Sequence, residues 1–412
     1  MIEAKASENF TPAPDDGAAQ DRQHGRSVSA ASFSARDDFD RDVWCLMGLP
    51  VDAADINRAV AEIDASVRDQ KKLSFVTPNV NWMVSALRDP EVRQEILDAD
   101  MSFVDGAPLV MMAKMLGVPV RSRVAGSDIF EALRRRPAFA GRPLRVFFFG
   151  GRDGAAEKAV AALEQEHGGV TAAGYHNPGF GDVASMSTPE IISKINGAKP
   201  DFVLVALGAR KGQAWIDQNK ERLDAPVTAH LGAVIDFAAG AIQRAPTWVQ
   251  KAGFEWAWRI KEEPSLWKRY LKDGVSLAGA LVSRLAPQLI ARTGRASGRE
   301  AVVNSINNAS ETFIELSGDL TRVSLSTVRP VLRMAAERKL DVVLDLSNVE
   351  YFDRAFLGLV LMLEKHVARS GRTLYVNGAN AGQKAVFRAN AMGYPSYEGI
   401  TEDEQDLNTA AI

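Results

Sequence analysis

The chain lacks the residues on which disulfide-rich scaffolds and zinc modules depend. Its 412 residues include one cysteine, Cys45, and five histidines. A single cysteine excludes an intrachain disulfide and a cysteine-rich metal site. No uncharged apolar run is long enough to cross a membrane, and the N-terminus has no apolar signal-peptide core. We therefore expect a cytoplasmic protein without a membrane-spanning helix.

The chain also lacks an excess of one charge. Its net charge of −3 provides no bulk attraction to nucleic acid or to anionic lipid, so any such affinity must be local. His176 and His230 have no partners at metal-ligand spacing, and the Asp-x-Asp triplet at 98–100 closes a helical pattern instead of ending a strand. We therefore predict no nucleic-acid partner, no metal site and no cofactor.

Length and composition predict two domains with tails, because a chain this long exceeds what one hydrophobic core usually organises. Residues 1–38 contain few large apolar groups and are predicted to be a disordered tail. The remaining predicted parts are an α/β domain at 39–243, a basic Trp-rich appendage at 244–291, a linker at 292–300, a small βαβ domain at 301–400 and a tail at 401–412.

The first domain is predicted to be a doubly wound, Rossmann-like parallel sheet. Short apolar runs alternate with helix-length segments, a pattern typical of a parallel sheet covered on both faces. A shorter strand pattern, VWCLMGLPVD, precedes them. The predicted strands lie in KKLSFVTPN, MSFVDG, LRVFFFGG, GVTAAGYH, DFVLVALG and APVTAHLGAVIDF.

Polar and glycine residues follow several of these strands. Ligands of doubly wound sheets gather at the carboxyl ends of the strands. Thr77, Asp105, Gly150, Gly208 and Asp236 all lie near such ends. The sequence therefore predicts a ligand site along this edge.

Each of these residues also has an ordinary structural interpretation. In TPNVN, Pro78 disfavours helix at Thr77, and either Asn79 or Asn81 can cap the following helix or bind a polar ligand. Asp105 can likewise cap a helix or act as a general base. The glycines of FFFGGRDG suit a diphosphate, but the full GxGxxG fingerprint is absent, so a nucleotide diphosphate and a dinucleotide stay open.

The appendage at 244–291 combines positive charge with tryptophan. Eleven Lys or Arg stand against four Asp or Glu between residues 244 and 299, and four of the seven tryptophans fall in the first half of this stretch. The ordinary interpretation is a solvated pair of amphipathic helices. Trp together with Arg and Lys is also the combination favoured at a membrane interface, and arginine binds diphosphate with two parallel hydrogen bonds. We predict contact with a membrane surface here.

Several motifs together resemble the WecG/TagA/CpsF family of bacterial glycosyltransferases over residues 43–273. They are TPNVN, FVDGAPLV, RVAGSD and LGAVIDFAAGAIQRAPTWVQKAGFEWAWRIKEEPSLWKRY. The resemblance implies transfer of N-acetylmannosamine, its uronic acid or glucose from a UDP donor, with inversion and without a metal. The implied acceptor is a polyprenyl-diphosphate-linked saccharide at the inner face of the cell membrane.

The resemblance also assigns roles to matching positions. Asp105 would be the general base, with Thr77 and Asn79 in the same pocket. The donor and its diphosphate would be held by Arg123, Gly126, Asp128, Gly208, Lys211, Asp236, Arg244, Arg259 and Arg269. The sequence departs from the family at 208–213, where Gly-Ala-Arg-Lys-Gly-Gln replaces Gly-x-Pro-Lys-Gln-Glu. This departure puts the identity of the donor sugar in doubt.

The last domain resembles the STAS fold of anti-sigma-factor antagonists. Its strands are expected in TFIELSGDL, DVVLDLSNV and RTLYVNGA, with helices at 324–338, 356–369 and 382–392. A serine that can be phosphorylated commonly follows the aspartate matching Asp353, but here Arg354 and Ala355 follow it. We therefore expect a role in assembly or partner docking in preference to phosphoregulation.

The leading hypothesis is thus a membrane-peripheral glycosyltransferase of surface polysaccharide or exopolysaccharide synthesis. An alternative is a non-catalytic transferase-like scaffold regulated through its STAS domain. A nucleotide-dependent oxidoreductase is disfavoured by the missing dinucleotide fingerprint. Homo-oligomerisation and a protein partner for the STAS domain stay open.

Overall fold

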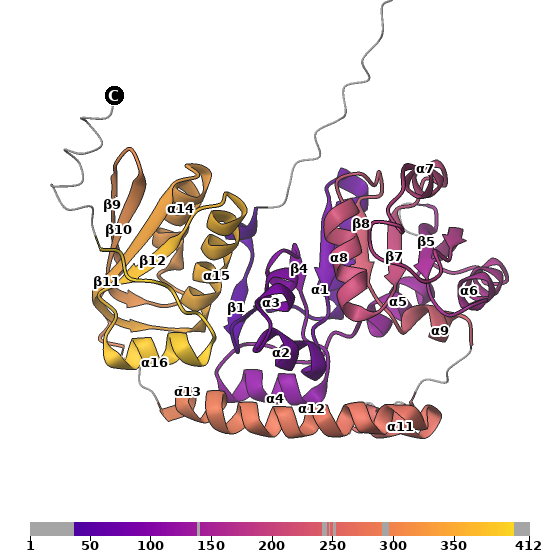
Figure 1. Cartoon of the computed structure of the whole chain (residues 1–412), viewed down its shortest axis with the longest axis horizontal. Helices are drawn as coiled ribbons and strands as arrows, with labels where there is room; N and C mark the ends of the chain where they lie inside the picture. The colour runs from indigo at the N-terminus through magenta and orange to yellow at the C-terminus, as the bar shows by residue number, and fades with distance from the viewer. Residues whose placement is uncertain are drawn as a thin grey trace, which may run out of the picture. The chain divides into compact units, whose positions relative to one another are not determined.

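Six strands form a parallel sheet in the order β4-β3-β8-β7-β5-β6 (Figure 1). The computed structural model describes residues 37–137, 141–240, 245–246, 248–249, 253–290 and 296–398. The predicted tails therefore lie outside the described residues, except that Asp37 and Asp38 are described and Asp38 is buried. The strands are β3 (Leu73–Val76), β4 (Met101–Ser102), β5 (Leu144–Gly150), β6 (Val170–His176), β7 (Phe202–Ala206) and β8 (Val227–His230).

Helices cover both faces of this sheet, as predicted for a doubly wound fold (Figure 1). In β5, Phe148 packs in one hydrophobic cluster while its neighbours Phe147 and Phe149 pack in another, because successive side chains point to opposite faces. The helices are α1 (Ile56–Asp69), α2 (Val80–Ala86), α3 (Pro90–Leu97), α4 (Ala107–Met115), α5 (Gly126–Arg135), α6 (Ala155–Glu164), α7 (Pro189–Gly197), α8 (Ala209–Asn219) and α9 (Val234–Ala238).

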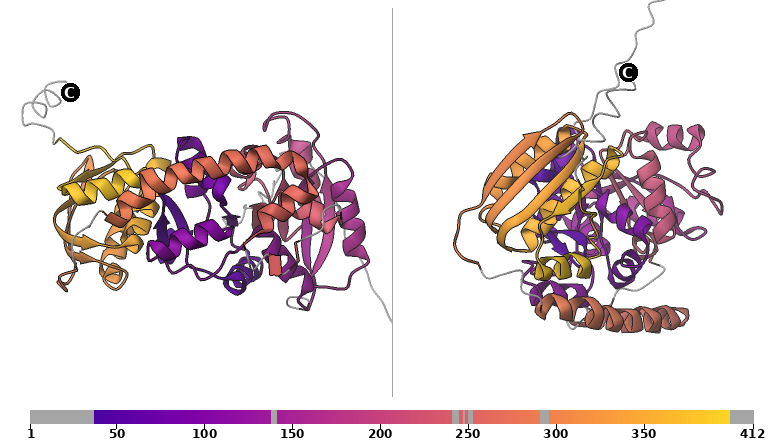
Figure 2. Two further views of the ribbon diagram at one scale, coloured as in Figure 1. Left: turned by 90° about the horizontal axis from the view of Figure 1, so that it is seen from below. Right: turned by 60° about the vertical axis from the view of Figure 1, so that its left-hand side comes forward.

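A helical arm follows the sheet domain, and the left view of Figure 2 shows it from below. It consists of α11 (Glu255–Glu262), the 3-10 turn η2 (Pro264–Leu266), α12 (Trp267–Ala280), the π-helical segment η3 (Leu281–Leu285) and α13 (Ala286–Ile290). The turn η2 follows Glu263 and separates the two amphipathic helices α11 and α12. Pro287 has no N–H to donate to the preceding turn, which accounts for the wider π turn just before α13.

The C-terminal domain contains a second sheet in the order β12-β11-β10-β9. All three predicted strands and all three predicted helices are present, with shifted ends. They are β10 (Glu311–Leu320), β11 (Asp341–Phe352), β12 (Leu374–Asn377), α14 (Leu325–Glu337), α15 (Arg354–Arg369) and α16 (Ala381–Ala389). An additional edge strand, β9 (Val302–Asn307), pairs antiparallel with β10 and was not predicted.

The first strand pattern, VWCLMGLPVD, forms a separate antiparallel hairpin of β1 (Val43–Leu46) and β2 (Leu49–Asp52). The hairpin packs against α15 of the C-terminal domain and does not join the six-stranded sheet. Its backbone comes so close to α15 that a Cβ at Gly358 would lie 2.2 Å from the carbonyl oxygen of Val43. One hydrophobic cluster consequently contains side chains of the hairpin, of α2–α4 and of the C-terminal domain.

Candidate functional site

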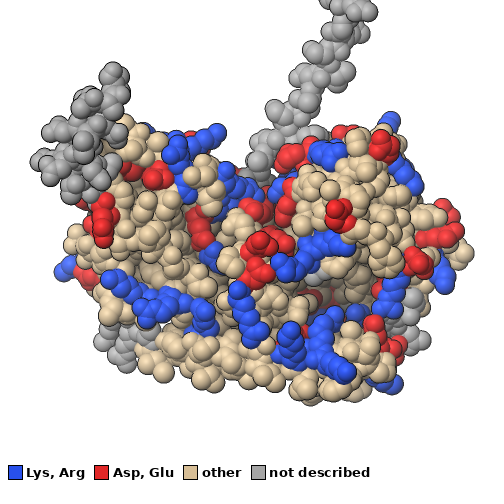
Figure 3. All heavy atoms as spheres, viewed as in Figure 1, with Lys and Arg blue, Asp and Glu red and all other residues tan. Residues whose placement is uncertain are grey.

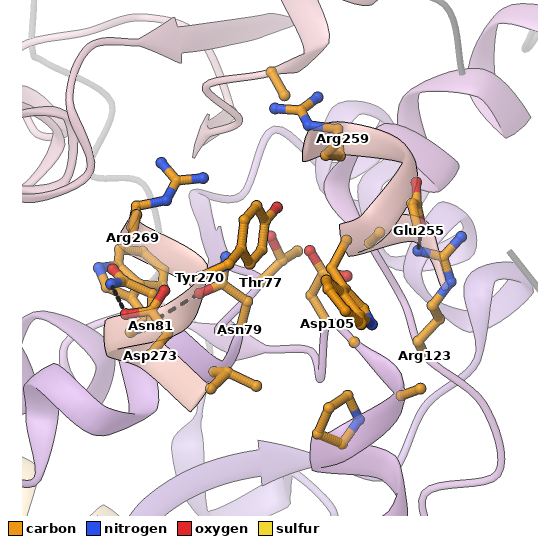
Figure 4. A pocket seen from close by; sticks show the side chains of 18 of the residues that line it. Thr77, Asn79, Asn81, Asp105, Arg123, Glu255, Arg259, Arg269, Tyr270 and Asp273 are labelled. Carbon is orange, nitrogen blue, oxygen red and sulfur yellow. Dashed lines mark hydrogen bonds and ion pairs between the residues drawn. The ribbon is translucent and has the colours of Figure 1, made fainter. Parts of the chain in front are cut away.

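A cavity of about 1130 Å³ lies between the carboxyl ends of β3, β4 and β8 and the helical arm (Figure 4). Thr77, Asn79 and Asp105 line it from the sheet side. Arg259 and Arg269 line it from α11 and α12. Residues predicted from separate motifs of the sequence are thus brought into one cavity.

The sheet side of the cavity is built from the first turns of three helices. Asn79 is the N-cap of α2, because its Oδ1 accepts a hydrogen bond from Trp82 N at 3.1 Å, and it also lines the cavity. Both interpretations of Asn79 are therefore compatible. Gly106 precedes α4 at a positive φ of 104°, and Gly126 begins α5. The exposed N–H groups and dipoles of helix N-termini favour an anionic ligand such as a diphosphate.

Close packing fixes glycine at the start of α5. A Cβ at Gly126 would lie 2.3 Å from Cδ2 of Leu231 and 3.5 Å from Oγ1 of Thr77. Any larger residue would collide with the Leu231 side chain, which also lines the cavity, whereas the Thr77 hydroxyl lies at an ordinary contact distance. The role of Gly126 in the structure is thus to let two parts of the cavity wall meet.

Asp105 lies half-buried in the cavity, in the loop between β4 and α4. Its backbone N–H donates to Pro78 O at 2.9 Å, which joins the loops after the two neighbouring strands. Burial raises the pKa of the Asp105 carboxyl to about 7, with Glu255 and Asp128 adding to the rise and Arg123 and Arg259 opposing it. A carboxylate with a pKa near neutrality is well suited to accept a proton from a hydroxyl group.

Arg123 bridges two carboxylates at the edge of the cavity. Its Nη2 lies 3.2 Å from Oδ2 of Asp128 in α5, and its Nη1 forms an ion pair with Glu255 in the first turn of α11 (Figure 4). Arg123 lines the cavity, whereas Asp128 does not. The pair of Arg123 and Glu255 fastens the beginning of the arm to the sheet domain.

A second ion pair fastens the end of α11. Arg152 Nη2 lies 3.0 Å from Oε1 of Glu263, and Arg152 Nε lies 3.8 Å from Oδ2 of Asp236. Burial raises the pKa of Asp236, and the positive charges of Arg152 and Arg259 oppose this rise. Asp236 does not line the cavity. It contributes to the contact between α9 and the arm.

Arg259 and Arg269 offer positive charge to a ligand in the cavity. Their guanidinium groups lie 5.3 Å from the ring centroids of Phe237 and Tyr270, respectively. Within the described ranges of the chain, neither forms an ion pair with a carboxylate. Arg244 lies outside the described residues. Two of the three predicted arm arginines therefore line the cavity.

Gly208 and Lys211 do not line the cavity. Gly208 is the N-cap of α8, and Lys211 Nζ donates to the carbonyl oxygen of Gly181 at 2.6 Å. Both lie beside the carboxyl end of β7, further along the sheet. The departure of this sequence from the family pattern thus falls outside the cavity that contains Asp105.

Several lining residues were not among the predicted site residues. Glu255 lies 132 positions from its partner Arg123, and no local pattern connects them. Asn81 Nδ2 donates to Oδ1 of the buried Asp273 at 2.8 Å, which fixes α12 to α2. The Trp82 Nε1 group is buried and has no hydrogen-bond partner in the described part of the chain. A polar ligand in the cavity could accept from it.

An exposed apolar stripe runs along the arm from the rim of the cavity. Trp267, Leu271 and Val275 are 50%, 59% and 67% exposed and also line the cavity, so its rim is apolar. Val282 continues the stripe at 75% exposure. Figure 3 shows Lys and Arg side chains gathered over this part of the surface. The described residues contain no helix that is both long and apolar enough to span a membrane.

Comparison with known proteins identifies the two parts of the chain. The profile of the glycosyl transferase WecG/TagA/CpsF family matches residues 44–289, more than half of the chain. An STAS domain profile (Mlab, STAS domain) matches residues 306–393. The solved structure of the anti-sigma factor antagonist SpoIIAA in its unphosphorylated form matches with a TM-score of 0.22 and 17% identity, over 27% of this chain and 100% of that one.

Two curated relatives are N-acetylglucosaminyldiphosphoundecaprenol N-acetyl-beta-D-mannosaminyltransferases. The protein of Bacillus spizizenii is 28% identical over 219 residues, which are 53% of this chain and 82% of that protein. The protein of Bacillus subtilis is 27% identical over 199 residues, which are 48% of this chain and 74% of that protein. The chain therefore belongs to the WecG/TagA/CpsF family of glycosyltransferases and carries an STAS domain behind the transferase region.

Proposed function

We propose that this glycosyltransferase moves a sugar from a UDP donor to a polyprenyl-diphosphate-linked saccharide, with inversion and without a metal ion. The sugar is N-acetylmannosamine, its uronic acid or glucose. The names of the two Bacillus relatives support an acceptor of this class and a mannosamine-type donor. The product would serve cell-surface polysaccharide or exopolysaccharide synthesis.

The observation that carries the proposal is the position of Asp105 between helix N-termini and arm arginines. An acceptor hydroxyl oxygen forms a bond to the anomeric carbon while the bond from that carbon to the diphosphate breaks. The carboxylate of Asp105 takes the hydroxyl proton. The negative charge that develops on UDP is stabilised by Arg259, Arg269 and the helix N-termini. A single displacement of this kind inverts the anomeric centre and needs one base.

The apolar rim of the cavity supports an acceptor that stays in a lipid surface. Trp267, Leu271 and Val275 are exposed at the rim, and Lys268 and Lys272 flank them. Apolar side chains beside basic ones bind the boundary between acyl chains and anionic headgroups. The arm can thus lie on the membrane while the diphosphate of the acceptor enters the cavity beneath it. The protein would then be peripheral to the inner face of the cell membrane.

A non-catalytic scaffold is the second candidate, and the ion pairs of Arg123 favour it. Glu255 and Asp128 already neutralise this guanidinium, and residues 208–213 depart from the family pattern. The near-neutral pKa of Asp105 and the two arginines at the cavity favour the enzyme. A scaffold would bind UDP-sugars without consuming them.

Thermal shift with a panel of UDP-sugars, with and without EDTA, tests the proposal. A ligand that binds the native state alone at about 100 times its Kd stabilises it by about 2.7 kcal/mol. We expect stabilisation by one donor that survives chelation, followed by transfer of that sugar to a polyprenyl-diphosphate-linked acceptor. Binding without transfer would support the scaffold, and loss of activity with EDTA would contradict metal independence.

A further inference from the structure

One helix connects the cavity to the STAS domain. It runs from Trp267 to Ile290 through α12, η3 and α13, a length of about 36 Å at 1.5 Å per residue. Its first half lines the cavity, including Arg269 and Tyr270. Its second half buries Ala280 and Leu285 in the cluster that the STAS domain shares with the hairpin. The position of the arm at the cavity therefore depends on what holds its far end.

The far end is held by polar contacts with the STAS domain. Gln288 is 5% exposed, and its Oε1 accepts a hydrogen bond from Nη1 of Arg354 at the start of α15. Gln288 Nε2 reaches the carbonyl oxygen of Ala389 at 3.4 Å. Arg284 Nη1 donates to the carbonyl oxygen of Arg388 at 2.8 Å. Two successive turns of the arm thus bind the N-terminus of α15 and the C-terminus of α16.

Arg354 occupies the position where an STAS domain commonly has its phosphorylatable serine. Asp353 before it caps α15 by accepting hydrogen bonds from Ala355 N at 2.9 Å and Phe356 N at 3.1 Å. The cap fixes the backbone of Arg354, so its side chain leaves the domain in a defined direction. In this chain the position is used for a contact with the arm.

The STAS domain is itself fixed to the transferase domain. Every residue of α15 from Ala355 to Leu363 is buried, so the helix is covered on all sides. Lys365 is fully buried, and its Nζ lies 2.9 Å both from Oδ2 of Asp38 and from the carbonyl oxygen of Ala99. Glu364 forms an ion pair with Arg93 of α3. A support attached in this way can hold the arm in one position.

The same packing reaches the floor of the cavity. Met83 of α2 and Met112 of α4 belong to the hydrophobic cluster shared with the STAS domain. The first turns of α2 and α4 carry Asn79 and Gly106, which line the cavity. The STAS domain therefore packs against the helices on the sheet side of the cavity and also against the arm that lines its other side.

We propose that the STAS domain of this chain is a fixed anchor for the catalytic arm, and that Arg354 and Gln288 are positioning residues of the transferase. Through them the domain sets how closely Arg259 and Arg269 approach a diphosphate in the cavity. The catalytic consequence rests on the proposed function, whereas the mechanical role of the anchor does not.

A double-mutant cycle of Arg354→Ala and Gln288→Ala tests the anchor. Hydrogen exchange of peptides from 267–290 reports on the arm, and peptides from α14 report on the STAS core. We expect each variant to speed exchange in the arm by roughly tenfold or more, as for loss of one hydrogen bond to a charged group. The double variant should add little to either single variant, because both remove the same contact.

Steady-state kinetics separate positioning from a merely structural role. We expect the KM for the UDP-sugar to rise and kcat/KM to fall by roughly 10-fold to 100-fold, since a misplacement of about 1 Å has effects of this size. Arg354→Lys, which still donates to Gln288, should restore part of the loss. Arg372→Ala, at an exposed position of the same domain, is the matched control and should change nothing.

Unchanged arm exchange in the double variant would overturn the anchor. A rise of exchange in α14 would mean that the two substitutions also loosen the STAS core. In that case Arg284→Ala is measured in place of Arg354→Ala and Gln288→Ala, because it removes only the contact with the carbonyl oxygen of Arg388. Failure of the wild-type chain to transfer any sugar would refute the proposed function alone. In that case faster arm exchange in the variants would still support the anchor.

Discussion

Arg123 and Glu255 form an ion pair between the loop before α5 and the first turn of α11. The pair closes the arm over the sheet domain beside Asp105. It also places two opposite charges near that carboxyl, where Glu255 raises its pKa and Arg123 lowers it. The contact between the arm and the sheet domain and the pKa of the proposed base therefore depend on the same residues.

The first prediction concerns the pH dependence of transfer. A general base must be deprotonated, and the pKa of Asp105 is about 7. The rate constant kcat/KM should thus rise about tenfold per pH unit below pH 7 and level off above it. A pH–rate profile checks this expectation. A profile that is flat between pH 5 and pH 8 would contradict the role of Asp105.

The second prediction is that two charge changes move this profile in opposite directions. Glu255→Gln removes a negative neighbour, so the pKa of Asp105 should fall and the acidic limb should shift to lower pH. Arg123→Gln removes a positive neighbour and should shift the limb to higher pH. The two profiles are measured beside that of the wild type. Shifts in the same direction would show that the residues act on the structure and not on the charge of Asp105.

The third prediction concerns the buried ion pair between the two domains. Burial alone would raise the pKa of Asp38, but His366, Lys365 and Arg41 hold it well below its usual range. Asp38 therefore stabilises the fold above pH 4, and this contribution is lost as the pH falls below that value. Asp38→Asn leaves Lys365 without its buried counter-ion and should reduce the free energy of unfolding by about 3–5 kcal/mol.

Urea denaturation at pH 7 and at acid pH measures both effects of Asp38→Asn. Asp40→Asn is the control, since Asp40 is exposed and its contact with Arg333 lies at the surface. We expect that variant to change the free energy of unfolding by less than about 1 kcal/mol. Equal losses in the two variants would show that burial of the Asp38 pair has no special role.

The fourth prediction concerns the close approach of the hairpin to α15. A Cβ at Gly358 would lie 2.2 Å from the Val43 carbonyl oxygen, so Gly358→Ala must push the hairpin away from the helix. We expect a loss of about 1–3 kcal/mol in the free energy of unfolding. Gly393→Ala is the control, because nothing lies within 4 Å of a Cβ built there. Equal stability of the two variants would contradict a fixed interface.

The fifth prediction concerns the membrane surface. Val282 belongs to the apolar stripe and does not line the cavity. Val282→Glu should weaken binding to anionic lipid vesicles by roughly tenfold, because one buried valine contributes about 1.5 kcal/mol and the added charge is repelled. Val323→Glu, at an 89% exposed position of the STAS domain, is the control. Equal binding of both variants in a sedimentation assay would place the membrane contact elsewhere.

Local patterns in the sequence were sufficient to predict the parallel sheet and the edge of the sheet at which the cavity lies. β7 is a continuous apolar run, β3 is apolar except for Ser74, and a parallel sheet brings the residues after its strands to one side. Thr77 and Asp105 could therefore be assigned to one site from the sequence, and both line the cavity. The same logic placed Gly208 at that edge, although it does not line the cavity with Asp105.

The remaining features depend on contacts between distant parts of the chain. β9 is exposed at every residue but one and lacks a strong apolar pattern, so no strand was predicted there. Glu255 is one of several acids in a basic segment, and its partner Arg123 lies on another element. The packing of the β1–β2 hairpin on α15 depends on Gly358, far along the chain. Such long-range pairs leave no periodic signal in a single sequence.

Comparison of sugar transfer by the wild-type chain and by Asp105→Asn tests the central claim most directly. Both proteins would receive the UDP-sugar that stabilises the wild type and a polyprenyl-diphosphate-linked acceptor at pH 8. We predict equal thermal stabilisation by the donor and a transfer rate reduced by roughly 10²-fold to 10⁴-fold in the variant. A variant that transfers sugar at the wild-type rate would contradict the assignment of Asp105 as the base.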